Sequence, residues 1–280
     1  MAIPSSLLRD RVVVITGASQ GIGRGIALGC AQAGARVVVH HLGTEAALQD
    51  ARSLLQEIER IASTRQGDEV DAGTAAAAAA AIEVGGDISD PATADRIVAA
   101  ALAAYGRIDG LVSNAGICPF YSFLDIPHAA WEKTRSVNLD GAFYVVQAVA
   151  RQMSQQQEPK GGSIVAVSSI SALAGGGQQA HYTPTKAGVK SLMESCAISL
   201  SPYGIRCNSV LPGTIETPIN EQDLAADSDK RAYMEKRIPL GRLGKPEDLA
   251  GPTVFLLSDM AQYVTGASLL VDGGAFVNLQ

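Results

Sequence analysis

Short runs of hydrophobic residues alternate with longer amphipathic stretches along the chain. The first run, Val12–Ile15, is followed by a glycine-rich turn, a helical pattern that ends near Gly34, and a second hydrophobic run that begins at Arg36. Continuous runs of β-branched residues are typical of strands buried on both faces of a parallel sheet. The order of strand, turn, helix and strand therefore predicts a βαβ unit.

The same alternation continues to the end of the chain. We predict one doubly wound parallel sheet of the Rossmann type, flanked by helices on both faces. No boundary divides the pattern, so residues 1–280 are predicted to form a single dinucleotide-binding and catalytic domain. The further strands are expected at about 82–84, 108–112, 163–167, 206–211 and 268–271, and helices at 92–105, 131–155, 183–200 and 220–237.

One segment, at about 57–81, does not fit a compact domain. It joins a polar run to seven consecutive alanines and has few large apolar groups. Such a stretch is too long for an ordinary connection and cannot build a core of its own. We predict a surface insertion without chemistry, formed either by an extended helix with a mobile tip or by a disordered loop.

Composition narrows the classes of function. A hydrophobic content of 47% supports a large core, and a net charge of -6 argues against binding to nucleic acid or to an anionic membrane. The N-terminus lacks the apolar core of a signal peptide, and no apolar run is long enough to span a membrane. The four cysteines have no metal-ligand spacing, so we expect buried free thiols, no metal site and a cytoplasmic location.

The first turn contains Gly17, Gly21 and Gly23 between a predicted strand and a predicted helix. Glycine there permits a tight turn, lets the backbone approach a pyrophosphate, and leaves the amide groups of the helix N-terminus free to bind it. A structural turn would also use glycine, but this position in the first βα unit favours dinucleotide binding.

Tyr182 and Lys186 are four residues apart, so in a helix their side chains share one face. A free tyrosine has a pKa of about 10, and a neighbouring cation lowers that value enough to make the phenol a useful base or acid. Pro184 lies between them and is well tolerated only in a first turn, which places the start of the helix here. Taken alone, the pair could be a chance feature of a solvated helix.

The motifs together resemble those of the short-chain dehydrogenases/reductases. The glycine spacing Gly-xxx-Gly-x-Gly, the Asn114-Ala115-Gly116 motif, Ser169 thirteen residues before Tyr182, and the Val271-Asp272-Gly273-Gly274 motif all match that family. The resemblance implies hydride transfer to or from a nicotinamide cofactor. It implies catalytic roles for Asn138, Ser169, Tyr182 and Lys186, with Tyr182 as the base and Asn138 holding a water that links Lys186 to solvent.

The resemblance also implies a set of cofactor-binding residues. They are Gly17, Ser19, Gln20, Gly21, Ile22, Gly23, His41, Asp87, Ile88, Asn114, Ala115, Gly116, Tyr182, Lys186, Pro212, Gly213, Ile215 and Thr217. His41 stands where NAD-specific members carry an acid, and no evident arginine for a 2′-phosphate follows it. Arg24, or a protonated His40 or His41, remains able to reach that phosphate, so we expect the protein to use both NAD and NADP.

The expected substrate pocket is polar but uncharged. Its predicted side chains are Ser169, Ser171, Gln179, Thr214 and Asn220, with Cys118 and Phe120 on a neighbouring loop. Buried polar groups need partners, so this set suits a neutral polyol better than a steroid or an acyl chain. The loop at 114–120 also resembles that of bacterial and fungal aldose 1-dehydrogenases, those acting on L-rhamnose in particular. We therefore predict oxidation of a sugar at C1 to its lactone.

Two other functions stay open. One is a 3-oxoacyl-thioester reductase that uses NADPH, because the catalytic core would be the same. The other is a dinucleotide-binding protein without catalysis, which the presence of Ser169, Tyr182 and Lys186 disfavours. The stretches 131–155 and 183–200 have long apolar faces that could simply pack on the sheet, and the segment 264–277 is also apolar. The resemblance implies that such helices pair across subunits, so we expect a homotetramer, with a dimer as second choice.

Overall fold

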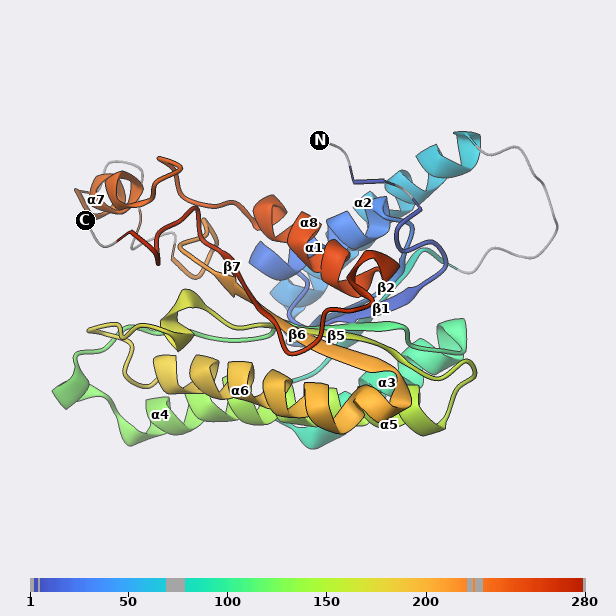
Figure 1. Cartoon of the computed structure of the whole chain (residues 1–280), viewed down its shortest axis with the longest axis horizontal. Coiled ribbons are helices and arrows are strands. Elements are labelled where there is room, and N and C mark those ends of the chain that lie inside the picture. The colour runs from blue at the N-terminus through green and yellow to red at the C-terminus, as the bar shows by residue number, and fades with distance from the viewer. Residues whose placement is uncertain (1–2, 5, 69–78, 221–223, 225–228, 279–280) are drawn as a thin grey trace.

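A sheet of parallel strands forms the centre of the protein. The computed structural model describes residues 3–4, 6–68, 79–220, 224 and 229–278, and in these the seven strands follow the order β3-β2-β1-β4-β5-β6-β7 (Figure 1). The strands are β1 (Val12–Ile15), β2 (Arg36–His41), β3 (Ala81–Gly85), β4 (Gly110–Ser113), β5 (Gly162–Val167), β6 (Ile205–Pro212) and β7 (Ser268–Val271). The predicted fold class, a doubly wound parallel sheet, is confirmed.

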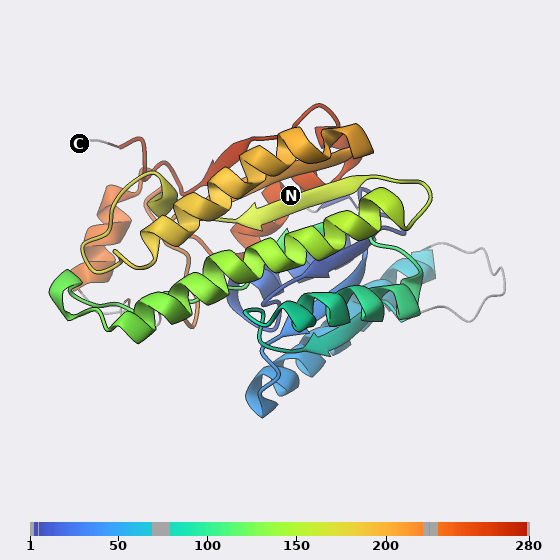
Figure 2. The ribbon, with the colours of Figure 1, turned by 90° about the horizontal axis from the view of Figure 1, so that it is seen from below.

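Helices cover both faces of this sheet. Figures 1 and 2 show α1, α2 and α8 on one face and α3, α5 and α6 on the other. The first layer packs onto the sheet through residues such as Ile26, Leu54 and Val254, and the second through Val145 and Met193. The helices are α1 (Gly21–Gln32), α2 (Glu45–Asp68), α3 (Pro91–Tyr105), α4 (His128–Arg135), α5 (Gly141–Gln155), α6 (Thr183–Leu200), α7 (Asp229–Arg237) and α8 (Ala250–Leu257).

The strand order places the site. The chain winds outward from β1 to β3 in one direction and from β4 to β7 in the other, so the topology reverses between β1 and β4. In such sheets, ligands bind in the crevice at the carboxyl ends of the strands beside that reversal. The glycine turn after β1 and the Asn114 motif after β4 both lie at this edge.

The long helix predicted at 131–155 has a defect within it. The chain forms α4, then a π-helical turn at Ser136–Asp140, and then α5. A π-turn inserts an extra residue into a helix and is frequent at functional sites, and no spacing rule for regular helices could reveal it. The turn contains Asn138, one of the predicted catalytic residues.

Two other helices differ from prediction. The helix expected at 220–237 is present only as α7 (Asp229–Arg237), and residues 221–223 and 225–228 lie outside the described part of the chain. The helix α8 (Ala250–Leu257) was not predicted, because it is apolar and buried and lacks the amphipathic pattern of a surface helix.

The predicted insertion begins inside a helix. α2 continues from Glu45 to Asp68 and buries Ala51, Leu54 and Ile58 against the core, so position 57 is not a structural boundary. Residues 69–78, which include the predicted mobile tip, lie outside the described residues. The insertion therefore stays a prediction.

Two further predictions concern the burial of the cysteines and segments able to span a membrane. All four cysteines are free, but Cys118 and Cys196 are partly exposed, so the expectation of buried thiols is right for Cys30 and Cys207 alone. Among the described residues, no helix combines the length and the apolarity that crossing a bilayer requires.

Candidate active site

The glycine turn has the backbone geometry that the sequence predicts. Gly17 and Gly21 have φ angles of 61° and 55°, in the left-handed region that glycine adopts without strain. A Cβ on Gly23 would lie 2.3 Å from the carbonyl oxygen of Gly17, so only glycine fits there. Gln20 precedes α1 without capping it by its side chain. The first amide groups of α1 therefore face outward as an anion-binding helix N-terminus, which fits the pyrophosphate of a dinucleotide.

His40, which was predicted only as an alternative phosphate ligand, supports this turn. The amide of Gly17 donates to His40 Nδ1 at 3.2 Å, and His40 Nε2 lies 2.9 Å from the carbonyl oxygen of Gly86. Burial lowers the pKa of His40 to about 4, so the ring is neutral at neutral pH. Both of its nitrogens are in use. The expectation that a protonated His40 could hold a phosphate is therefore wrong.

The Asn114-Ala115-Gly116 motif, which follows β4, is hydrogen-bonded to the same turn. Thr16 Oγ1 accepts hydrogen bonds from the amides of Asn114 and Ala115 at 2.9 and 3.0 Å. Asn114 Nδ2 donates to the carbonyl oxygens of Thr16 and Gly17 at 2.8 and 3.0 Å. The two motifs, nearly a hundred residues apart in sequence, are thus one structure.

The segment predicted to cover the nicotinamide also comes to the turn. A Cβ on Gly21 would lie 3.4 Å from Thr217 Cγ2, which places Thr217 beside the glycine turn. The amide of Gly213 donates to the carbonyl oxygen of Val271 at 3.0 Å, and Ile215 is buried. The segment that follows β6 therefore lies beside the glycine turn.

Asp87 and Ile88, predicted to contact the adenine, lie at the end of β3. The Asp87 carboxylate accepts hydrogen bonds from Ser89 and, at 2.8 Å, from Lys133 Nζ. Burial alone would raise the pKa of Asp87, but these bonds lower it to about 2. The side chain of Ile88 is buried against Gly141. Lys133 was not predicted, because its distance of 46 positions from Asp87 leaves no signal in the sequence.

The expected phosphate ligand Arg24 is turned toward α2. Its guanidinium donates to Ser53 Oγ and to the carbonyl oxygens of Ser19 and Asp50, and it forms an ion pair with Glu57. The prediction that it reaches a 2′-phosphate therefore finds no support in this geometry.

His41, the other candidate at this edge, is bound to protein groups as well. Its Nε2 lies 2.7 Å from Glu83 Oε2, and its Nδ1 accepts the amide of Gly43 at 3.2 Å.

Tyr182, Lys186 and Ser169 come together at the start of α6. Tyr182 directly precedes the helix, and Pro184 lies in its first turn, as predicted. Lys186 Nζ is 5.7 Å from the centroid of the Tyr182 ring and donates to the carbonyl oxygen of Val167 at 2.9 Å. The Ser169 hydroxyl lies close enough to the Tyr182 phenol to lower its pKa by hydrogen bonding.

The charge states of the pair differ from the sequence-based prediction. Burial raises the pKa of Tyr182 above its ordinary value, the nearby Cys118 sulfur raises it further, and the Ser169 hydrogen bond acts in the opposite direction. Burial also lowers the pKa of Lys186 to about 8. The prediction that Lys186 lowers the pKa of Tyr182 is therefore wrong for this site, because burial raises that pKa and Lys186 is not among the groups that lower it.

Asn138 is held in the π-turn by both ends of its amide. Its Oδ1 accepts the amide of Ile117 at 2.8 Å, while Nδ2 donates to the carbonyl oxygen of Ile117 at 2.9 Å and to Thr185 Oγ1 at 3.2 Å. A Cβ on Gly116 would lie 3.2 Å from Asn138 Oδ1 and 3.4 Å from Lys186 Nζ. Glycine at 116 thus keeps a small space open between the amide and the ammonium.

The predicted substrate residues differ in the groups that they contact. Gln179 Nε2 donates to Cys118 Sγ at 3.2 Å, which joins the two loops around Tyr182. The amide of Ser171 donates to Ser169 Oγ at 3.0 Å. Thr214 accepts the amide of Gly244 through its backbone at 3.0 Å. Asn220 differs from the free amide that was expected: its Oδ1 accepts the amide of Thr217 at 3.0 Å and its Nδ2 donates to the carbonyl oxygen of Ile215 at 2.8 Å.

The fold and this site define a dinucleotide-dependent oxidoreductase. Residues 11–84 match the family model for short chain dehydrogenase, and residues 51–275 match a related model described as enoyl-(acyl carrier protein) reductase. The chain belongs to the short-chain dehydrogenase/reductase family. It is therefore an NAD(P)-dependent oxidoreductase that acts on CH–OH groups, and the resemblance drawn from its motifs is confirmed.

Individual relatives are similar over their whole length. The chain is 58% identical to L-rhamnose 1-dehydrogenase (NAD(P)(+)) of Azotobacter vinelandii, over 98% of this chain and 100% of that one. It is 36% identical to 3-oxoacyl-[acyl-carrier-protein] reductase of Thermotoga maritima, over 96% and 99% of the two chains. A solved structure of a short-chain alcohol dehydrogenase, so described, from Sinorhizobium meliloti superposes with a TM-score of 0.85 at 32% identity, covering 99% and 100%.

Proposed function

We propose that the protein oxidises L-rhamnose at C1, giving the lactone and passing hydride to NAD⁺ or NADP⁺. The observation that carries this proposal is the 58% identity, along nearly all of both chains, to a relative named for that reaction. The polar side chains near Tyr182 support it, since Gln179, Ser169 and Ser171 offer amide and hydroxyl groups to a neutral sugar.

Proton transfer is assigned to Tyr182. As hydride leaves C1, the deprotonated oxygen of Tyr182 accepts the proton of the C1 hydroxyl group and becomes the neutral phenol, while Ser169 donates a hydrogen bond to the same substrate oxygen. The bound oxidised cofactor would supply the hydride acceptor and a positive charge. Burial raises the pKa of Tyr182, and we assign stabilisation of its deprotonated form to the Lys186 ammonium, which lies 5.7 Å from the ring centroid.

We assign the return of that proton to Lys186 and Asn138. The ammonium and the amide oxygen border the space that Gly116 leaves open, and a space bordered by an ammonium donor and an amide acceptor suits one water molecule. A proton released at Tyr182 would pass through this water rather than through the hydrophobic core.

A screen of initial rates tests the proposal. Purified protein would be assayed with L-rhamnose and other aldoses with NAD⁺ and NADP⁺, and with an acetoacetyl thioester and NADPH. We expect L-rhamnose to give the highest kcat/KM with both cofactors. Preference for the thioester would favour the reductase function of the 36% identical relative. Turnover of none of these compounds despite cofactor binding would favour the non-catalytic alternative.

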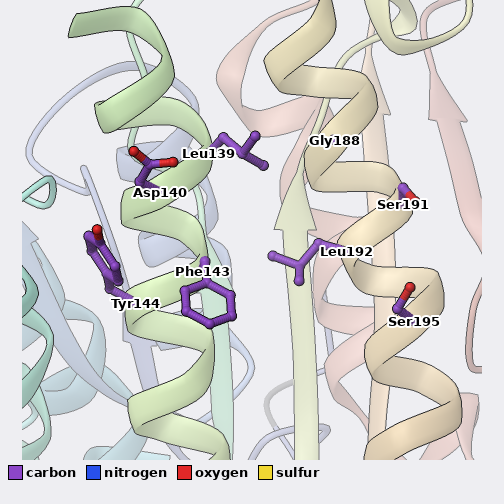
Figure 3. A pocket seen from close by; sticks show the side chains of 8 residues that line it. All are labelled: Leu139, Asp140, Phe143, Tyr144, Gly188, Ser191, Leu192 and Ser195. Carbon is purple, nitrogen blue, oxygen red and sulfur yellow. The ribbon is translucent and has the colours of Figure 1, made fainter. Parts of the chain in front are cut away.

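The proposed assembly is a homotetramer in the cytoplasm. Leu139 in the π-turn and Leu192 in α6 point toward each other, and Figure 3 shows them in a groove that also contains Phe143 and Gly188. The groove has a volume of about 600 Å³. Phe143 is 43% exposed, which is costly for a phenylalanine that faces water. The free cysteines support a reducing compartment. Light scattering would distinguish the tetramer from a dimer or monomer.

A further inference from the structure

A glutamate and a buried histidine from neighbouring strands form a pair at the dinucleotide edge of the sheet. His41, the last residue of β2, is 2% exposed, and Glu83 on β3 has a side chain that is 33% exposed. Because the amide of Gly43 donates to His41 Nδ1, the ring proton is on Nε2, which donates to Glu83 Oε2 at 2.7 Å. In this arrangement the ring is neutral, and Glu83 retains its negative charge.

This pair lies next to the phosphate-binding turn. His40, the residue before His41, accepts the amide of Gly17 and so fixes the end of β2 against the turn. His41 in turn orients the loop at 42–44 through its bond to Gly43, whose φ angle is 88°. In folds of this type, an acid about 20 residues beyond the glycine turn holds the ribose hydroxyl groups. Here the acid comes from the adjacent strand.

The cations at this edge do not neutralise Glu83. Arg24 is paired with Glu57, Lys133 with Asp87 at 2.8 Å, and Arg96 with Asp90 at 3.7 Å. Of the acids named here, Glu83 alone has a neutral ring as its partner. These ion pairs therefore leave the negative charge of Glu83 without a cation of its own among the described residues.

We propose that Glu83 sets the balance between NAD⁺ and NADP⁺. Its carboxylate holds His41, and through it the loop at 42–44, while like-charge repulsion weakens binding of a 2′-phosphate. A ribose with free hydroxyl groups has no such penalty. The proposal rests on the proposed use of both cofactors but not on the identity of the sugar.

Direct binding tests it without turnover. Dissociation constants of NAD⁺ and NADP⁺ would be measured by calorimetry for the substrate-free wild type, Glu83→Gln and Glu83→Ala, with Glu132→Gln as a control for the loss of one exposed carboxylate. Glu83→Gln keeps an acceptor for His41 and removes the charge. We expect this variant to bind NADP⁺ about tenfold more tightly and to change NAD⁺ binding less than about twofold. The increase in NADP⁺ affinity should become smaller at high salt.

The second variant separates charge from positioning. Glu83→Ala should also favour NADP⁺ over NAD⁺, but it should weaken NAD⁺ because His41 loses its partner. An unchanged ratio of the two constants in both Glu83 variants, or an equal change in Glu132→Gln, would overturn the proposal. Failure of the wild type to bind either dinucleotide would instead refute the proposed function.

Discussion

The two halves of the site are built differently. The cofactor half is held by backbone groups: the Gly17 amide on His40, and the Thr16 and Gly17 carbonyl oxygens on Asn114. The substrate half is held by side chains, such as Gln179 on Cys118. It also contains His181, which is fully buried and whose two ring nitrogens have no hydrogen-bond partner among the described residues. The polar groups named in the cofactor half thus all have hydrogen-bond partners, whereas His181 in the substrate half has none among the described residues.

Two buried histidines make the contrast concrete. His40 has both nitrogens bonded and joins the glycine turn to the loop after β3. His181 makes an edge-on contact with Tyr121, with ring centroids 5.6 Å apart. A buried polar group without a partner destabilises a protein by about 1–3 kcal/mol. The cofactor half therefore contributes to stability, and the substrate half costs some of it.

The largest expected effect comes from Lys186→Met, which separates activity from stability. We expect kcat/KM to fall by about 10³-fold, because the cation beside Tyr182 is lost. Burial lowers the pKa of Lys186 from 10.5 to about 8, so the charged form is destabilised in the folded state. At pH 7 the free energy of unfolding measured in urea should therefore be about 3 kcal/mol higher for the variant than for the wild type.

The increase in the free energy of unfolding caused by Lys186→Met should become smaller as the pH rises. Between about pH 8 and 10.5 Lys186 is protonated in the unfolded chain but not in the folded one. The destabilisation of the wild type by its buried ammonium is therefore full below pH 8 and disappears as the pH rises through that window. Lys190→Met, on the same helix but paired with Glu194 at the surface, should show neither effect. A destabilised Lys186→Met at pH 7 would contradict the assignment of a buried ammonium.

An intermediate effect is expected from His40→Ala in the cofactor half. Losing the partner of the Gly17 amide should weaken cofactor binding about tenfold, as measured by calorimetry. The folded pKa of His40 is about 4 against 6.5 unfolded, so wild-type stability should fall by up to about 3 kcal/mol as pH drops from 6.5 to 4.

That acid-dependent loss should be smaller in His40→Ala. The matched control is His128→Ala, at the exposed start of α4, which should retain the wild-type pH slope and cofactor affinity. The same slope in His40→Ala as in the wild type would show that His40 titrates normally when folded.

The smallest effect is expected from His181→Phe in the substrate half. The ring contact with Tyr121 is kept while two unpartnered nitrogens are removed, so the free energy of unfolding should rise by about 1 kcal/mol. Urea denaturation measures it. Destabilisation by a similar amount would mean that the nitrogens are bonded in solution, and the contrast between the halves would then be weaker.

This contrast also explains what the sequence can reveal. The strands and the glycine turn follow from runs such as Val12–Ile15 and from φ angles that glycine favours, both of which are local properties. The pairing of Tyr182 with Lys186 follows from helical spacing, while Ser169 was added by the resemblance of its position to the family motif. The structure brings the three together where β5 ends and α6 begins.

Other features depend on contacts between distant segments. The bonds of Lys133 to Asp87 and of Glu83 to His41 join residues more than forty positions apart. The π-turn around Asn138 depends on packing that helical periodicity does not express. The balance of desolvation and charge at Tyr182 is likewise a property of the folded site, which is why its pKa was predicted in the wrong direction.

The central claim is that Tyr182 transfers the proton while the cofactor half binds independently of it. The most direct measurement compares Tyr182→Phe with the wild type for kcat with L-rhamnose and for the dissociation constant of NADP⁺. We expect kcat to fall by about 10³-fold or more and the dissociation constant to change less than about twofold. Turnover within tenfold of the wild type, with the cofactor bound normally, would contradict this assignment.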